Sequence, residues 1–549
     1  MERKISAETW RYTEITLYAE KEYENPAKNI ILDMEITNGT KTLVFPAFWN
    51  GKNEYCFRFA LPCAGIWVYK TACNVDDGNL KNVFGVVDCK EYSGDLEIFR
   101  RGFLRAGNRM FLYADGTPFF YLGDTHWNFL SEEFNRAGEH AGGIDCDSHF
   151  KHIIRHRISQ GFTVYQTEAL ETGYVLTDGI DEKDIEYFKK ADEYFKFIAD
   201  SGLVHANAQF FFPKDMIKLM QETDEEEMYS LLDVLSRYWV ARYGAFPCLW
   251  TLGQEVDNDF YFNECANTNH TLTKENNPYK KIAEMIHKYD PLKQPLSAHQ
   301  EGSYYIGRFT TAINSAFREI PAHTWWANQW KPVLNAPLDF TAPIDYWYNG
   351  QNKPIINYEA RYELLWTNSL GARIQGWIAF LNGMFGHGYG VVDMWLYKST
   401  YDIKNPTRRD GIEISVEEKL TRWGKSIDLP GGKAMEYMKQ FFLTFDWFRL
   451  VPCFDENKYL IADGGYYSAA HIDRDIFAAY FYDKIDGEPA KETGTFINLD
   501  ENARYTYTWF DPENGVFLKT LPANVKNGCF ALGERPSAKD WAVLIKKES

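Results

Sequence analysis

Two glutamates, Glu255 and Glu359, each end a short apolar run of the kind that forms a buried strand. The runs read "CLWTLGQE" at 248–255 and "PIINYE" at 354–359. A pair of carboxyl groups can cleave a glycosidic bond, because one protonates the leaving oxygen while the other attacks or stabilises the oxocarbenium-like centre. A separation of about 5–5.5 Å leads to retention at the anomeric carbon, and one of about 6.5–9.5 Å leads to inversion.

Each glutamate also has an ordinary structural explanation. Glu255 could cap the helix that follows its strand, since acidic groups stabilise helix N-termini. Glu359 has a neighbour, Glu363, in the stretch "YEARYE", and one of the two could pair with Arg361. We favour Glu359 for chemistry because it directly follows the apolar run.

The elements that must position these glutamates are eight apolar runs that alternate with amphipathic helical stretches. The runs span 119–127, 162–169, 204–212, 248–255, 295–301, 322–329, 354–359 and 376–386. This alternation indicates an α/β fold with a parallel sheet, and eight strands predict a (β/α)8 TIM barrel over 99–450. An open doubly wound sheet is the alternative, but no GxGxxG motif follows the first strand.

In a (β/α)8 barrel the active site lies at the C-terminal ends of the strands. Most of the expected strands end in polar or aromatic groups, Gln329 among them, as suits a cleft for a polyhydroxylated ligand. The candidate substrate-binding residues are Asp124, His126, Trp127, Glu168, Gln209, Gln254, His299, Trp326 and His387.

The roles expected of these residues follow from their chemistry. Asp124, His126 and Glu168 would hydrogen-bond sugar hydroxyls, although Asp124 could instead hold a loop and Glu168 could belong to a buried ion pair. Trp127 and Trp326 could stack on a sugar ring, and Trp127 fits packing equally well. Because Trp325 and Trp326 are adjacent in a strand, only one of them should face the cleft.

The barrel is flanked by segments with a different pattern. Residues 1–98 and 451–549 show short alternating stretches separated by turn clusters, which predict an N-terminal and a C-terminal antiparallel β-sandwich. Either sandwich could shape one wall of the cleft or form the contact surface of a homo-oligomer, and the sequence leaves both roles open.

Composition excludes several classes of partner. The net charge of −18 argues against nucleic acid and anionic membranes, and no apolar run is long enough to span a bilayer. The start "MERKISAETWRY" lacks the apolar core of a signal peptide, so we expect a cytoplasmic protein.

We expect no metal or cofactor. No CxxC pair occurs, and the histidines of "HFKHIIRH" share a helix face that carries no carboxylate. The first strand has "DTH" where metal-dependent barrels often place HxH.

Several motifs resemble those of the apiosidase-like glycoside hydrolases, a barrel family related to glycoside hydrolase family 140. They are "GTPFFYLGDTHW", "GQEVD", "KPIINYEARYE", "FGHGYG" and "LPGGKAMEYMKQFF". The stretch "FWNGKNEYCFRFALPCAGIWVYKT" resembles the β-sandwich before such barrels. The stretch "ARYTYTWFDPENGVF" resembles the small sandwich after them, often labelled a collagen-binding domain.

The resemblance implies an acid/base residue at Glu255 and a nucleophile at Glu359. Two positions differ from relatives: Glu255 stands where some members have Asp, and Gln254 stands where the wider clan has Asn. Each change alters the reach of the site by about one methylene, so the resemblance implies a glycosidase without fixing apiose as its sugar. His387, in "GHGYG", would close the cleft from strand eight.

The expected function is therefore hydrolysis of a glycosidic bond in a plant- or microbe-derived oligosaccharide or glycoside, with retention. Glu359 would be ionised and Glu255 would hold its proton, because apolar surroundings disfavour the charged form. A non-catalytic carbohydrate-binding protein on a degenerate barrel is the main alternative, but both carboxylates are present. A collagen-binding protein is the third hypothesis for the function.

Overall fold

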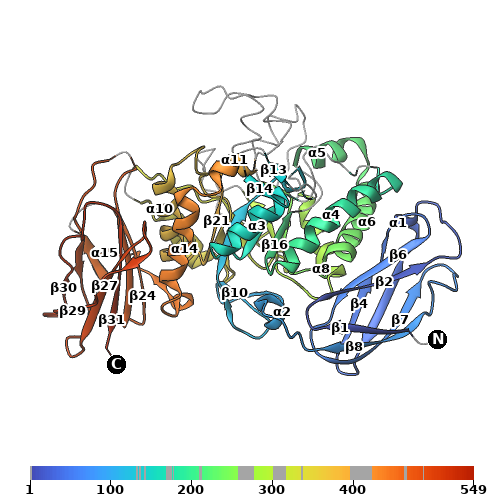
Figure 1. Cartoon of the computed structure of the whole chain (residues 1–549), viewed down its shortest axis with the longest axis horizontal. Helices are drawn as coiled ribbons and strands as arrows, with labels where there is room; N and C mark the ends of the chain where they lie inside the picture. The colour runs from blue at the N-terminus through green and yellow to red at the C-terminus, as the bar shows by residue number, and fades with distance from the viewer. Residues whose placement is uncertain are drawn as a thin grey trace.

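The protein consists of a central barrel with a β-sheet region at each end, as the computed structural model shows (Figure 1). The structure describes residues 3–131, 134, 138–140, 144–168, 176, 178–208, 213–256, 277–300, 317–335, 338–395, 423–454, 456–462, 466–485 and 487–548. Among these residues no helix is both long and apolar enough to cross a membrane.

Eight parallel strands close into the central barrel. In order around the barrel they are β12 (Tyr121–Thr125), β15 (Val164–Thr167), β16 (Val204–Ala208), β17 (Cys248–Leu252), β18 (Leu296–Gln300), β19 (Trp326–Asn328), β20 (Ile355–Asn357) and β21 (Gly386–Tyr389). Each pairs in parallel with the next, and β21 returns to β12. The predicted (β/α)8 barrel is confirmed, and seven strands fall within their predicted runs. The eighth run, 376–386, is wrong as a strand: most of it forms the end of α10 (Ser369–Leu381) and the turn after it, and β21 begins only at Gly386. A short apolar run fits a buried helix as well as a buried strand.

Large side chains fill the barrel axis. Tyr121, Leu249, Trp325, Ile356 and Tyr358 come from different sides of the barrel and pack in one apolar cluster. A small sheet of β9 (Arg105–Gly107), β10 (Met110–Leu112) and β11 (Pro118–Phe119) contributes to the same cluster. The barrel is thus a packed core rather than a pore, as small barrels of this kind are.

Helices surround the barrel on its outer face (Figure 1). The longer ones are α3 (His149–Ser159), α4 (Glu182–Asp200), α5 (Pro213–Glu222), α6 (Glu225–Tyr243), α8 (Tyr279–Tyr289), α9 (Thr341–Asn349), α10 (Ser369–Leu381) and α14 (Pro430–Phe442). Several begin at a side-chain cap: the side chain of Asp181 accepts from the backbone at the start of α4, and that of Asp224 does so for α6. Shorter elements are η1 (Phe129–Ser131), β13 (Gly138–His140), β14 (Ile144–Cys146) and α11 (Val392–Trp395).

The N-terminal region is a sandwich of two sheets. One sheet has the order β1 (Arg3–Glu8), β8 (Phe84–Lys90), β7 (Gly65–Cys73), β3 (Leu32–Thr37), β4 (Thr42–Pro46), and the other has β2 (Tyr12–Tyr18), β6 (Glu54–Ala60), β5 (Phe48–Trp49). The pairing is antiparallel as predicted, except that β1 runs parallel to β8. The two short helices are α1 (Pro26–Asn29) and α2 (Glu97–Arg100).

The C-terminal region also has two sheets. The larger has the order β22 (Val451–Pro452), β24 (Tyr466–Ile472), β25 (Ile476–Tyr482), β31 (Trp541–Lys547), β27 (Tyr505–Asp511), β28 (Val516–Phe517), with β29 (Leu521–Ala523) also paired to β27. The smaller has β23 (Leu460–Ala462), β26 (Gly494–Phe496), β30 (Phe530–Ala531), and the segment also contains η3 (Trp447–Arg449) and α15 (Glu456–Tyr459). The domain boundaries near residues 98 and 450 stay predictions.

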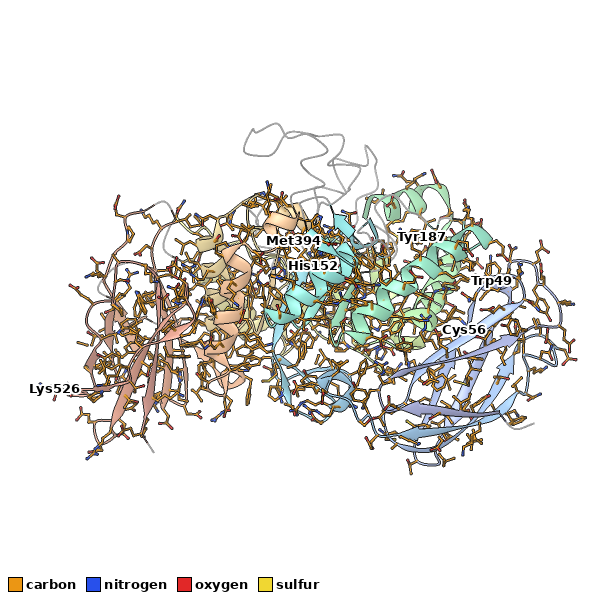
Figure 2. The ribbon with its side chains drawn as sticks, in the orientation of Figure 1. Trp49, Cys56, His152, Tyr187, Met394 and Lys526 are labelled. Carbon is orange, nitrogen blue, oxygen red and sulfur yellow. The ribbon has the colours of Figure 1, made fainter. Side chains whose placement is uncertain are left out.

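Buried ion pairs join each flanking region to the barrel. At the C-terminal side, Arg373 of α10 donates two hydrogen bonds of 2.7 Å to Asp540, which also accepts from Tyr480. At the N-terminal side, Tyr238 of α6 donates to the backbone oxygen of Trp49, and Figure 2 shows Trp49 on the part of the sandwich that meets the barrel helices.

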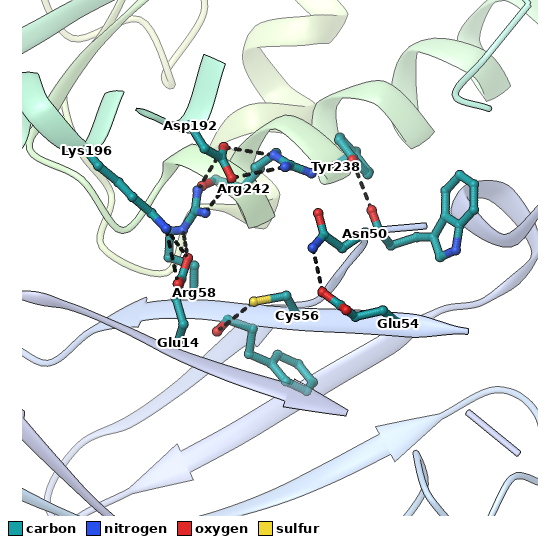
Figure 3. A network of polar contacts seen from close by, with 11 residues as sticks. Glu14, Asn50, Glu54, Cys56, Arg58, Asp192, Lys196, Tyr238 and Arg242 are labelled. Atoms are coloured by element: carbon teal, nitrogen blue, oxygen red, sulfur yellow. Dashed lines mark hydrogen bonds and ion pairs between the residues drawn. The ribbon is translucent and has the colours of Figure 1, made fainter. Parts of the chain in front are cut away.

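The contact at the N-terminal side is centred on Asp192 of α4 (Figure 3). Its carboxylate accepts from Arg58 of β6 at 2.8 Å and from Arg242 of α6 at 2.9 and 3.0 Å. Burial alone would raise the pKa of Asp192, but the two guanidinium groups outweigh it and lower the pKa to about 2. Arg58 also pairs with Glu14 at 2.7 Å.

We predict that Asp192→Asn lowers the free energy of unfolding by about 3–5 kcal/mol, because two buried arginines lose their anion. Chemical denaturation followed by circular dichroism measures this change. The matched control is Glu284→Gln, which breaks the exposed Lys281–Glu284 pair and should cost less than about 1 kcal/mol. Equal effects of the two substitutions would contradict the assignment.

The ion pairs of Asp192 also predict that the free energy of unfolding depends on pH. Because the folded pKa of Asp192 lies below the value of about 3.9 in an unfolded chain, its contribution is present above that pH. It amounts to about 2–3 kcal/mol and is lost as pH falls from about 4 to about 2. The stability advantage of the wild type over Asp192→Asn should therefore shrink over that interval.

Candidate active site

The C-terminal ends of four barrel strands bring polar side chains to one place. Glu255 follows β17, His299 lies near the end of β18, Gln329 directly follows β19, and Glu359 follows β20. All four side chains are buried. Since the strands are parallel, these ends lie at the same end of the barrel, where (β/α)8 enzymes hold their active sites.

A single amide group links the two glutamates. The Nε2 of Gln329 donates to Oε1 of Glu255 at 2.7 Å and to Oε2 of Glu359 at 3.1 Å. The two acceptor oxygens are therefore no more than 5.8 Å apart, the length of the two bonds (2.7 Å and 3.1 Å) laid end to end. The carboxylates expected to work together do share one site.

Lys331 supplies a positive charge to this site. Its Nζ lies 3.1 Å from Oε1 of Glu359 and donates to Oε1 of Gln329 at 2.8 Å. The ammonium group also lies 4.5 Å from the centre of the Trp366 ring. Because a buried charge is costly unless it is paired, the pairing with Glu359 accounts for a lysine that is only 4% exposed.

The backbone at Glu255 adopts a conformation that is rare for a residue with a side chain. Its φ angle is 48°, in the left-handed region. Such a conformation costs on the order of 1–3 kcal/mol and is concentrated at functional sites. Gly253 precedes it with φ 50°, and a Cβ there would lie 2.7 Å from the ring of Tyr279. The turn after β17 thus has a geometry that places Glu255 beside Gln329.

Aromatic side chains pack next to the two carboxylates. The indole Nε1 of Trp127 donates to the hydroxyl of Tyr362 at 2.9 Å, and its ring stacks on His299 with centroids 5.5 Å apart. Burial raises the pKa of Tyr362 well above its usual value, and the charge of Glu359 adds to the shift. Burial lowers the pKa of His299 to about 4 despite the nearby charge of Glu359, so this imidazole is neutral at physiological pH.

Two other predicted residues form a separate buried cluster. Asp124 accepts from His126 at 2.5 Å and from Nε of Arg157 on α3 at 3.0 Å. Burial opposes ionisation of Asp124, but Arg157 and His126 outweigh it and lower the pKa of the carboxyl group. Asp124 therefore joins β12 to the helix layer, which matches the structural alternative for this residue.

Trp326 and His387 also lie away from the two glutamates. The indole of Trp326 donates to the backbone oxygen of Gly350, and Lys353 lies over its ring, whereas Trp325 packs inside the barrel. His387 lies 3.5 Å from Asn357, which alternates with the inward-facing Ile356 and Tyr358. Burial lowers the pKa of His387 to about 3.

The remaining predicted residues are Glu168, Gln254 and Gln209. Glu168 is buried directly after β15, and Gln254 is half-buried next to Glu255. Gln209 lies outside the described residues. His149 of α3 stacks on Trp423 with centroids 4.1 Å apart. In the part of the chain that the structure describes, no group of three His, Cys, Asp or Glu side chains could hold a metal ion.

Sequence reasoning missed Lys331 and Tyr362 as members of the site. A signal for Lys331 does exist, because residues 327, 329 and 331 alternate along the continuation of β19 and share one face. Tyr362 follows the strand end by several residues and carries no comparable signal.

The chain matches the family model described as "Apiosidase-like, catalytic domain" over residues 105–449. It belongs to that family. This membership makes the chain a glycosidase. Residues 6–74 match a domain of unknown function, DUF5060, and no curated protein matches the chain.

Solved structures similar to this apiosidase-like protein share its fold. A protein of Bacteroides vulgatus ATCC 8482, provisionally described as a glycoside hydrolase, is 16% identical with a TM-score of 0.67, over 99% of this chain and 100% of that one. A glycoside hydrolase family 5 protein of the same organism is 17% identical with a TM-score of 0.58, over 81% and 93%. At such identities the likeness shows the fold alone.

We predict that His299 stays neutral down to about pH 5, because burial lowers its pKa to about 4. NMR of protein labelled with ¹⁵N-histidine reports the protonation state of each imidazole as pH falls. The exposed His287 is the internal control, since solvent reaches it and it should take up its proton at a higher pH. Titration of His299 near pH 6.5 would contradict the buried environment described for it.

Proposed function

We propose that this apiosidase-like protein is a retaining glycoside hydrolase with Glu359 as nucleophile and Glu255 as acid/base. The observation that carries the proposal is the shared hydrogen-bond donor, Gln329, which keeps the bridged oxygens within 5.8 Å, the end-to-end length of bonds of 2.7 and 3.1 Å. Retaining enzymes have carboxyl groups about 5–5.5 Å apart, whereas inverting enzymes need about 6.5–9.5 Å to admit a water molecule.

The contacts of Lys331 support this assignment of roles. A cation 3.1 Å from Glu359 favours the negative charge that a nucleophile requires. Glu255 is 8% exposed at the end of an apolar strand, surroundings that suit a carboxyl group holding a proton.

The reaction then proceeds in two balanced steps. Glu359 attacks the anomeric carbon while Glu255 gives its proton to the leaving oxygen, so the glycosidic bond breaks and a glycosyl ester forms. Water then attacks the anomeric carbon, gives a proton to Glu255, and releases Glu359. The substrate would be an oligosaccharide or glycoside of plant or microbial origin. Trp127, Glu168, Gln254 and His299 are the candidates for contact with its reacting sugar.

We predict that Glu359→Gln lowers kcat by several orders of magnitude with little change in stability, because the amide cannot attack. Glu255→Gln should lower kcat by about 10²–10⁴-fold, the range for loss of a general acid/base. Glu363→Gln is the matched control, since Glu363 accepts from Tyr389 and Ser369 instead of joining the pair. Wild-type turnover by Glu359→Gln, or loss of turnover only in Glu363→Gln, would overturn the assignment.

We predict that the first product released has the same anomeric configuration as the substrate. A screen of aryl glycosides, pentofuranosides included, followed by ¹H NMR of the fresh product tests hydrolysis, sugar and stereochemistry together. Inversion would contradict the double displacement. Binding of sugars without any turnover would instead favour a carbohydrate-binding protein.

A further inference from the structure

The orientation of the Gln329 amide is fixed by its neighbours. Lys331 can only donate hydrogen bonds, so the group 2.8 Å from its Nζ must be the amide oxygen. The NH₂ group therefore points to Glu255 and Glu359. Nε2 of His299 lies 3.1 Å from the same amide nitrogen and 3.5 Å from Oε2 of Glu359, so this imidazole belongs to the network as well.

The proposed reaction moves one negative charge between the ends of this network. Before the first step the charge is on Glu359. When the glycosyl ester forms, the electron pair of Glu359 enters the bond to the anomeric carbon and Glu255 has lost its proton, so the charge is on Glu255. The second step returns it to Glu359.

Lys331 is connected to both positions of this charge. It contacts Glu359 directly at 3.1 Å. It reaches Glu255 through the amide, because a cation bound to the oxygen of Gln329 makes its N–H groups stronger donors. Gln329 and Lys331 are both buried, and electrostatic effects are largest where water is excluded.

We propose that Lys331 is a positioning residue that compensates the negative charge in both halves of the reaction. It acts directly on Glu359 before glycosyl transfer, and through Gln329 on Glu255 in the glycosyl-enzyme. This inference rests on the function proposed above and adds a third charged group to it.

The test measures the two half-reactions separately. The substrate is the 2,4-dinitrophenyl glycoside of the sugar found in the screen, and stopped-flow absorbance separates the burst of dinitrophenol (formation of the ester) from the steady state (its hydrolysis). Lys331→Met should slow both steps by on the order of 10²-fold, similar to loss of one preorganised donor, with KM changed less than threefold. Lys331→Arg, which keeps the charge, should recover part of both rates.

A second variant separates the two routes of compensation. Gln329→Met keeps the direct Lys331–Glu359 pair and cuts the connection to Glu255. It should therefore slow hydrolysis of the glycosyl-enzyme more than its formation, and it decides the question if Lys331→Met does not fold. Lys439→Met is the matched control, because Lys439 is a half-buried lysine of α14 whose Nζ donates to the backbone oxygen of Gly161.

The outcomes separate this inference from the proposed function. If Glu359→Gln is inactive but Lys331→Met keeps both rates, the role of Lys331 is refuted and the function stands. Slowing of only the first step in both Lys331→Met and Gln329→Met would also refute it. If Glu359→Gln retains full activity, the proposed function itself fails.

Discussion

The pairing of buried charges through one amide group is the constraint on which the active site depends. Two carboxyl groups brought together away from water repel each other unless something between them donates hydrogen bonds or carries positive charge. Gln329 provides the hydrogen bonds and Lys331 the charge. Both come from the segment after a single strand, β19, so one short stretch of chain fixes the distance between the glutamates that follow β17 and β20.

The rest of the barrel keeps that stretch in place. Tyr121, Trp325 and Tyr358 fill the axis, and a core packed at this density allows little movement of the strand ends. Asp124 of β12, Asp192 of α4 and Asp540 of the C-terminal region each accept from a buried arginine. These pairs join a strand to a helix or a flanking sheet to the barrel, so the two sandwiches contribute to the rigidity of the central domain.

The sequence predicts the scaffold well, because local patterns determine it. Seven of the apolar runs contain a barrel strand, whereas most of the run at 376–386 is the end of α10 and β21 begins at its last residue. Side-chain direction at the strand ends is less predictable. A barrel strand is buried on both faces, so its composition does not say whether Asp124 or Thr125 points inward, or which of Trp325 and Trp326 does. Convergence of Lys331 with Glu359 depends in addition on the register of the closed barrel.

The conformation of Glu255 places stability and function in opposition at one residue. Its left-handed backbone suits glycine, which has no Cβ to strain, whereas the proposed acid/base role requires a carboxyl group. A chain selected only for folding would drift towards glycine or asparagine at this position. The proposed role in turnover gives a reason for a glutamate that costs folding free energy at this position.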